Sequence, residues 1–275
     1  MSFEDKLIGY KDSFESFLKD YLKSLSGIDE ILLRSMEYSL FSGGKRIRPI
    51  LMLAVYEACG GESFEVYKFA SAIEMIHTYS LIHDDLPCMD NDLTRRGISC
   101  NHIKFGESTA LLAGDALLTL AFEIVSSCDF NKIKPEKILK CIEILSRQSG
   151  CKGMVSGQCM DLNQNIRSRE ELFKVYNLKT SCLISASTEI GAVLSGIQEE
   201  KILACKNYGQ NIGLCFQIVD DILDKDVKNL SHLKSPNAVE TVKELTEKAK
   251  AELDVLDSDT TFLKDFANFL MFRVC

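Results

Sequence analysis

Two acidic clusters are the groups in this sequence that could hold a metal ion. The first contains Asp84, Asp85 and Asp90 and is followed by Arg95 and Arg96. Carboxylates crowded this closely repel one another, so they normally need a cation between them. Oxygen ligands suit Mg²⁺, which proteins usually hold with one or two carboxylates together with substrate phosphates. Because arginines fit phosphate oxygens, the cluster predicts a site for a metal-bridged phosphorylated ligand.

The second acidic cluster, much later in the chain, contains Asp220, Asp221 and Asp224. On a helix, Asp220 and Asp224 lie one turn apart, and Asp221 is expected on the same side. Apolar residues fill the positions around them, which places the carboxylates at the edge of an apolar region. Such a cluster alone more often marks a solvated helix face, but the two clusters together favour metal binding.

The spacing around the first cluster predicts how its members are arranged. His77 and Asp84 are seven residues apart, which on a helix gives about 20° between their directions and about 10 Å in height. Asp90 would point about 120° away from Asp84 on an unbroken helix. Pro87 ends the regular turn, so the chain can fold Asp90 back toward the same metal.

Positive charge is concentrated in Gly43-Gly44-Lys45-Arg46-Ile47-Arg48-Pro49. Cations beside flexible glycines fit a diphosphate that is held without a metal, although a capping loop with surface charge would look similar. The segment is not a P-loop, because the spaced glycine and the Ser or Thr after the lysine are missing.

Isolated polar residues in two other segments are further candidates. Lys179 and Thr180 offer a cation and a hydroxyl after an amphipathic stretch, but a surface lysine would explain Lys179 equally well. Gln158 and Asp161 stand in an otherwise apolar segment. Polar groups in such surroundings need partners, so these two either satisfy the backbone or line the site.

The composition is that of a soluble globular protein, with 46% apolar and 26% charged residues in 275. The net charge of −8 argues against nucleic-acid binding and gives no positive case for an anionic membrane surface. No apolar run is expected to span a bilayer, so we predict no stable membrane insertion. The polar first residues are unlike a secretory signal. The eleven cysteines are scattered without a Cys-x-x-Cys pair, which favours a reducing, cytoplasmic location.

Helical periodicity dominates the chain, and no Pro/Ser-rich linker divides it, so we predict one all-α domain spanning residues 1–275. The stretch 108–126 is almost wholly apolar and is predicted to be buried on most sides. Other expected helices have clear start or stop signals, such as Pro135 and the Ser168 cap. Helices are predicted at about 7–25, 50–59, 63–87, 108–126, 135–149, 198–224, 235–256 and 261–272. A further helix is predicted to end at about residue 41, and another to start at residue 168.

Taken together, the motifs resemble the trans-prenyltransferases of the farnesyl and geranylgeranyl diphosphate synthase family. The resemblance follows the family's order over nearly the whole chain, and the joint pattern is highly specific. The matching segments are residues 43–49, 77–97, 101–107, 113–117, 153–162, 179–180 and 216–224.

The resemblance implies an all-helical bundle of the isoprenoid synthase type, with a central apolar cavity, in a homodimer. It implies a prenyltransferase, a farnesyl diphosphate synthase, that joins isopentenyl diphosphate head-to-tail to dimethylallyl and geranyl diphosphate through an allylic carbocation. The implied cofactor is Mg²⁺, with about three ions bound beside the substrates.

The family's site residues carry over to matching positions of this chain. Asp84, Asp85 and Asp90 match the first metal motif, and Asp220, Asp221 and Asp224 match the second. The resemblance implies catalytic roles for Asp84, Asp85, Asp90, Lys179, Asp220 and Asp221. The matching allylic-substrate positions are Arg95, Lys179, Thr180 and Gln217. The matching isopentenyl diphosphate positions are Gly44, Lys45, Arg48, His77 and Arg96.

Product length in the family depends on the residues four and five positions before the first motif, here Ser80 and Tyr79. Five helical residues place Tyr79 about 7.5 Å beneath Asp84, where a phenol could stop the growing chain. Plant geranylgeranyl enzymes commonly carry Met there, so Tyr79 favours a fifteen-carbon product.

One departure from the family pattern follows the second motif. The family's loop with its allylic-site lysine is missing or drastically shortened, which leaves Lys225, Lys228 and Lys234 as alternative replacements. Three other interpretations stay open: a geranyl or geranylgeranyl diphosphate synthase, a catalytically weak regulatory subunit, and a class I terpene cyclase. A cyclase would not need the cationic segment at 43–49.

Overall fold

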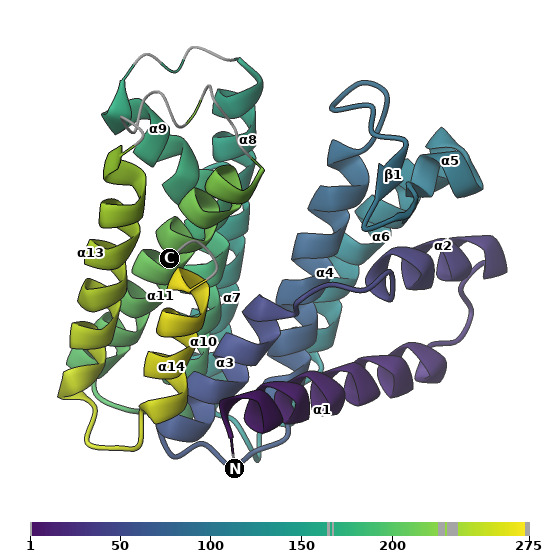
Figure 1. Cartoon of the computed structure of the whole chain (residues 1–275). Coiled ribbons are helices and arrows are strands. Elements are labelled where there is room, and N and C mark those ends of the chain that lie inside the picture. Colours follow the sequence, from purple (N-terminus) through teal and green to yellow (C-terminus); the bar gives the residue numbers. More distant parts are fainter. Residues whose placement is uncertain (1, 164–165, 167, 225–228, 230–235, 273–275) are drawn as a thin grey trace.

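The computed structural model describes residues 2–163, 166, 168–224, 229 and 236–272. Within these ranges the chain is mainly helical, and its only strand pair is a hairpin of two two-residue strands, so the all-α prediction is confirmed. Figure 1 shows the long helices side by side, with α4 and α6 in one part and α10, α11 and α13 in another. The helices are α1 (Phe3–Ser24), α2 (Glu30–Leu40), α3 (Ile47–Ala58), α4 (Val66–Asp84), α5 (Asn101–Phe105), α6 (Glu107–Ser126), α7 (Pro135–Ser149), α8 (Met154–Leu162), α9 (Arg169–Tyr176), α10 (Cys182–Ser195), α11 (Glu199–Leu223), α13 (Pro236–Glu252) and α14 (Thr261–Met271).

Short elements complete the list and matter for the site. A π-helical turn, η1 (Asn177–Ser181), runs directly into α10, and a 3₁₀ turn, η2 (Leu253–Val255), follows α13. Strands β1 (Thr94–Arg95) and β2 (Ile98–Ser99) pair in antiparallel register, and Arg95 faces Ile98. The hairpin follows the end of α4 and carries the paired arginines.

Helix ends lie where the sequence marks them. Pro135 is the first residue of α7, and the Ser168 hydroxyl accepts the backbone N–H of Glu171 at 3.2 Å, capping α9. A glycine of α11 allows close packing: a Cβ added to Gly213 would lie 2.5 Å from the Cα of Ser181. That contact holds α11 against the π-helical turn.

The core positions the two helices that carry the acidic clusters. α4 packs against α6 and α3, while α10 joins α3, α7 and α11, and α13 covers α11 from outside. On α4, Ala70, Ile73 and Ile76 are fully buried, as are Ile212, Cys215 and Ile218 on α11. Because both helices are buried along these faces, the positions of their C-terminal ends, which carry the aspartates, are fixed.

The prediction that residues 108–126 are buried on most sides is wrong. This helix, α6, packs along α4 with one face, but Leu111 and Leu112 on its other face are 46% and 57% exposed. The prediction that no apolar run could span a bilayer also needs correction. By length and composition alone, α6 is long and apolar enough to cross a membrane. However, 44% of this apolar stretch is buried inside the protein, and α6 packs along α4, so α6 is a helix of this bundle.

Candidate active site

The first acidic motif lies where α4 ends. Asp84 is the last residue of α4, and the backbone N–H of Asp90 donates to the Asp84 carbonyl at 2.8 Å. The turn that contains Pro87 therefore folds Asp90 back over the helix end, as its sequence predicts. Asp84 lines a cavity, whereas Asp90 is exposed to solvent beside it.

Asp85 already has a cation as its partner. Its side chain is buried, and its Oδ1 accepts Arg95 Nε at 2.6 Å and Nη2 at 2.5 Å. Arg95 also reaches Asp92 at 3.3 Å. Asp85 and Arg95 were predicted as a metal ligand and an allylic-substrate residue, and both roles stay predictions. In this structure their ion pair anchors the hairpin to α4.

The charge on Asp84 is costly in the ligand-free protein. Burial raises the pKa of Asp84 to about 6, Lys179 opposes that shift, and the Asp90 charge adds to it. A carboxyl that titrates this high has too little compensating positive charge around it. Such a group is suited to receive a cation.

The second acidic motif lies at the end of α11. The prediction that its three carboxylates share one side of the helix is wrong, because Asp221 points away from the other two. Asp220 lines the same cavity as Asp84, and Asp224 is exposed one turn later. Asp221 is buried instead, where it accepts the Tyr176 hydroxyl in a short hydrogen bond and Gln217 Nε2 at 2.9 Å. The cause is helix geometry, because consecutive residues point about 100° apart.

The π-helical turn η1 presents Lys179 and Thr180 to this motif. Thr180 Oγ1 donates to Gln217 Oε1 at 2.7 Å, and Lys179 Nζ lies 2.5 Å from Asp161 Oδ2. Asp161 thus has the partner that its apolar segment requires. A π-turn widens the helix locally, as is common at functional sites. Of the predicted replacements for the lost lysine, Lys225, Lys228 and Lys234 all lie outside the described residues.

A glycine allows this turn to approach α8. A Cβ added to Gly157 would lie 2.2 Å from the backbone nitrogen of Lys179. Gln158, the next residue, lines the cavity. The apolar segment around Gln158 and Asp161 therefore both supports and lines the site.

The predicted isopentenyl diphosphate residues surround a cavity of about 520 Å³. A Cβ on Gly44 would lie 2.8 Å from the Arg96 guanidinium, so that position needs glycine for space as well as for its φ of +122°. Lys45 Nζ lies 5.4 Å from the centre of the Phe216 ring. The predicted residues on the wall are Gly44, Lys45, Arg48, His77 and Arg96.

Three groups in this smaller cavity, Arg48, His77 and Arg96, have pKa values shifted against their charged forms. Burial lowers the pKa of Arg48 to about 10, with Glu74 opposing the shift and Arg96 adding to it. Burial, followed by the charges of Arg48 and Arg96, holds the pKa of His77 well below its usual range. His77 is therefore neutral near pH 7 and can donate one N–H to an anion.

A second cavity of about 890 Å³ adjoins the first. Asp84, Lys179 and Asp220 are on its wall, and its remaining lining is largely apolar, including Leu111 and Met154. The two cavities share residues along their common wall: Arg48, His77, Arg96 and Phe216.

The chain-length candidates also line the larger cavity. Tyr79 is 7% exposed, and its ring meets the His83 imidazole edge-on at 5.7 Å. The Ser80 hydroxyl donates to the His77 carbonyl at 2.8 Å, so it is bonded to its own helix. Tyr79 thus supplies the bulk at this position, and Ser80 leaves space.

Three contributors were not identified as site residues from the sequence. Phe216 separates the cavities, Tyr176 holds Asp221, and Glu74 borders the smaller cavity. Phe216 directly precedes Gln217, so its position in the motif was an available signal. Tyr176 and Glu74 have no comparable signal, because their partners are distant in sequence.

The side chains at the site fit a Mg²⁺ ion that is coordinated jointly by the protein and the substrate. Among the described residues, no three His, Cys, Asp or Glu side chains converge to hold an ion alone. Mg²⁺ usually takes one or two carboxylates and completes its shell with phosphate and water. Asp84, with its raised pKa, and Asp220 on the same cavity supply that type of ligand.

Comparisons with known proteins agree with this geometry. Residues 29–235 match the family model described as polyprenyl synthetase. Farnesyl diphosphate synthase of Geobacillus stearothermophilus is 42% identical over 226 residues, which cover 82% of this chain and 76% of that protein. Geranylgeranyl pyrophosphate synthase 4 of Arabidopsis thaliana is 47% identical over 197 residues, covering 70% of this chain and 52% of that protein.

A solved structure extends the likeness to the whole fold. The geranyltransferase of Legionella pneumophila superimposes with a TM-score of 0.92 at 32% identity, covering 98% of this chain and 97% of that one. The chain spans about half the length of most of the plant relatives it matches. Sequence, fold and family model point the same way, and the chain belongs to the polyprenyl synthetase family.

Proposed function

We propose that this protein is a Mg²⁺-dependent farnesyl diphosphate synthase. It joins isopentenyl diphosphate head-to-tail to dimethylallyl diphosphate and then to geranyl diphosphate. The observation that supports this best is the pair of adjoining cavities with a common wall. One is lined by cations, and the other combines carboxylates with apolar side chains, so two ligands with charged heads can be held next to each other.

Each cavity suits one substrate. Lys45, Arg48 and Arg96 offer positive charge to the diphosphate of isopentenyl diphosphate without requiring a metal. In the larger cavity, Asp84 and Asp220 would hold Mg²⁺ against the allylic diphosphate, and Leu111 and similar residues would accept its hydrocarbon tail.

The reaction follows from these charges. The allylic carbon–oxygen bond breaks, and its electron pair leaves with the diphosphate, close to Lys179 and Arg95. The isopentenyl double bond then attacks the allylic cation, and transfer of one proton to the released diphosphate restores a double bond. When bound, Mg²⁺ would neutralise charge on the departing diphosphate. The apolar wall would exclude water that would otherwise quench the cation.

Product analysis tests this proposal. The purified protein is incubated with Mg²⁺, isopentenyl diphosphate and either dimethylallyl or geranyl diphosphate, and the products are separated by chromatography. We expect farnesyl diphosphate from both primers. Absence of product from every primer would refute the enzyme proposal.

Tyr79 is proposed to set the product length. Tyr79→Ala should shift products beyond fifteen carbons, because it removes a ring that lines the larger cavity beneath Asp84. Ser80→Ala is the matched control, since its hydroxyl already bonds to its own helix and its loss frees little space. Chromatography of both variants checks this, and an unchanged product spectrum for Tyr79→Ala would reject Tyr79 as the floor.

A geranylgeranyl product is the second candidate, favoured by the 47% identity to the Arabidopsis geranylgeranyl pyrophosphate synthase 4. Accumulation of a twenty-carbon product by the unmodified protein would establish it. The same chromatographic run distinguishes the two.

We further propose that residues 1–275 form one domain that pairs as a homodimer. Leu112 on α6 and Ile103 on α5 are large apolar side chains that are 57% and 50% exposed, and a second copy would cover them. Replacing Leu112 and Ile103 by Glu should convert a species of twice 30.8 kDa into a monomer in light scattering. A wild-type protein that scatters as a monomer would contradict this.

The proposed location is the cytoplasm. The ten cysteines in the described ranges are all free thiols, and six of them are buried. Such a set is what a reducing compartment permits. Substrates rather than macromolecules are the proposed partners, since the net charge of −8 does not suit nucleic acid.

A further inference from the structure

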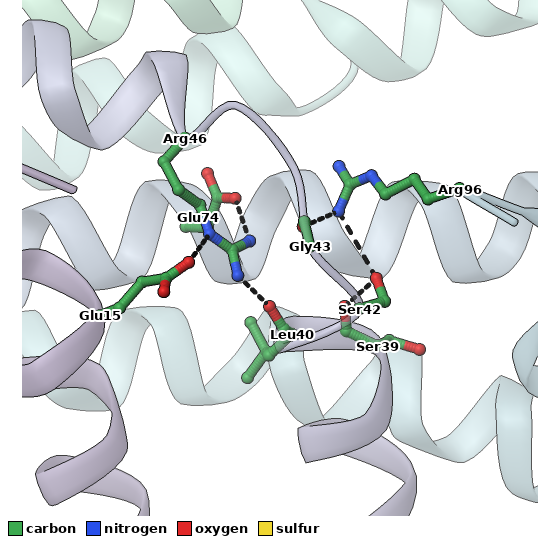
Figure 2. Close-up of polar contacts among 8 residues, drawn as sticks. All are labelled: Glu15, Ser39, Leu40, Ser42, Gly43, Arg46, Glu74 and Arg96. Carbon is green, nitrogen blue, oxygen red and sulfur yellow. Dashed lines mark hydrogen bonds and ion pairs between the residues drawn. The ribbon is translucent and has the colours of Figure 1, made fainter. Parts of the chain in front are cut away.

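The three cations of the segment 43–49 do not share one role. Lys45, Arg46 and Arg48 all border the smaller cavity, but the Arg46 side chain is only 1% exposed and is bonded within the protein. Figure 2 shows its guanidinium enclosed by three acceptors. Arg46 Nε donates to Glu15 at 2.9 Å, Nη1 to Glu74 at 2.9 Å, and Nη2 to the Leu40 carbonyl at 2.6 Å. Each guanidinium nitrogen of Arg46 therefore already donates to an acceptor within the protein.

These acceptors come from different parts of the bundle. Glu15 lies on α1, Leu40 ends α2, and Glu74 lies on α4. A single planar guanidinium thus ties three helices to the start of α3, a geometry that its fixed fork of donors allows and a lysine cannot reproduce.

The segment that Arg46 anchors has a costly backbone conformation. Arg46 itself has a φ of +51°, and Gly43 and Gly44 have values of +93° and +122°. A left-handed arginine is uncommon and persists only where its surroundings hold it. On the other side of this segment, Arg96 donates to the Gly43 carbonyl, so the segment runs between two arginines (Figure 2).

Glu74 gives Arg46 a second effect on the cavity. Glu74 is 2% exposed, borders the cavity and lies one helical turn before His77. Its charge acts on Arg48 and Arg96, in opposition to the effect of burial on their pKa values. Without Arg46, a buried carboxylate would be free to draw these two arginines away from a ligand. Glu15 is less affected, because 22% of its side chain reaches solvent.

We propose that Arg46 is a positioning residue for the isopentenyl diphosphate site. It fixes the backbone of residues 43–45, and it neutralises Glu74 so that Arg48 and Arg96 stay available to the diphosphate. This inference rests on the proposed function of the smaller cavity. Arg46 touches no substrate and acts only through its neighbours.

Steady-state kinetics of three variants test this role. Arg46→Met should raise KM for isopentenyl diphosphate roughly 10- to 100-fold, while KM for geranyl diphosphate stays near the wild-type value. Arg46→Lys should show a smaller rise. In the double variant Arg46→Met/Glu74→Gln, KM for isopentenyl diphosphate should recover part of the loss, because the stranded charge is gone. Lys206→Met is the matched control, since it breaks the pair with buried Glu189 and borders neither cavity.

The outcomes separate positioning from general stability. A purely structural role would lower Tm and change both KM values together, and the double variant would recover nothing; that result overturns the proposal. If Arg46→Met does not fold, Arg46→Lys carries the same test through its two KM values. An unchanged KM for isopentenyl diphosphate in Arg46→Lys would then reject the role.

A binding measurement distinguishes this inference from the proposed function. Calorimetry with inorganic pyrophosphate, without Mg²⁺, needs no turnover. If the wild-type protein makes no product, the proposed function fails, yet weaker pyrophosphate binding by Arg46→Met would still support the positioning role. If the wild-type protein is active and Arg46→Met binds pyrophosphate equally well, only the inference about Arg46 fails.

Discussion

Asp84→Asn is expected to abolish condensation while stabilising the ligand-free protein. Loss of a carboxylate at the proposed metal position should reduce kcat by roughly 10³-fold or more, as for other groups that stabilise developing charge. The gain in stability has a separate cause. Burial raises the pKa of Asp84 to about 6, so folding at neutral pH leaves a charge that the native state disfavours.

The sign of the pH dependence follows from this shift. The folded pKa lies above the unfolded value of about 3.9, so the folded state binds a proton more tightly. The contribution of Asp84 to the free energy of unfolding is fully present below about pH 4 and is lost as the pH rises through about 6. At pH 8 the Asn variant should be more stable by about 2 to 3 kcal/mol, and near pH 4 the difference should vanish.

Denaturant unfolding at both pH values, without Mg²⁺, measures this difference. Asp20→Asn is the control, because Asp20 is a 75% exposed carboxylate on α1 that borders neither cavity. A variant that loses activity and is also less stable at pH 8 would show that the Asp84 charge is compensated in the native state.

Arg48→Met is expected to remove isopentenyl diphosphate binding with little harm to the fold. Arg48 lines both cavities, and its buried Nε has no hydrogen-bond partner among the described residues. Burial lowers its pKa to about 10, so the folded state disfavours its charge. Loss of the guanidinium should lower kcat/KM for isopentenyl diphosphate about 10²- to 10³-fold, whereas Tm should stay constant or rise.

Kinetics, together with thermal unfolding in inorganic pyrophosphate, check the Arg48 prediction. Pyrophosphate should raise the Tm of the wild-type protein, and this shift should be lost in Arg48→Met. Arg34→Met serves as control, since Arg34 is a 66% exposed arginine on α2. If Arg48→Met keeps its pyrophosphate-dependent shift, the smaller cavity does not bind diphosphate through Arg48.

The sequence predicted most of the helices, some of their caps and one fold-back, because these depend on local chemistry. It did not predict α5, α8, α10 or the β1–β2 hairpin. Pro135 begins α7, Ser168 caps α9, and Asp90 returns to Asp84 after Pro87. Each of these features follows from dihedral limits or hydrogen bonds within a few residues.

The roles of individual charges could not be predicted in the same way, because their partners are distant in sequence. Asp85 is paired with Arg95 of the hairpin, Asp221 with Tyr176 of α9, and Arg46 with carboxylates on α1 and α4. Each sits in a motif beside a residue that does face a cavity. Motif membership thus located the site but did not distinguish residues facing the cavities from those that support them.

The exposure of α6 escaped prediction for a related reason. An apolar composition indicates that a surface is covered, but it does not identify what covers it. In the single chain, one face of α6 packs on α4, and Leu111 and Leu112 remain exposed on the other. In our proposal a second copy covers Leu112, whereas Leu111 lines the larger cavity.

The most direct test of the two-cavity account is a crystal structure with Mg²⁺, isopentenyl diphosphate and a non-reacting thio-analogue of geranyl diphosphate. We predict the isopentenyl diphosphate head against Lys45, Arg48 and Arg96. We predict the analogue's diphosphate, with Mg²⁺, between Asp84 and Asp220, and its tail running toward Tyr79. Density for both diphosphates in one cavity, or for the isopentenyl group away from the cationic wall, would contradict the account.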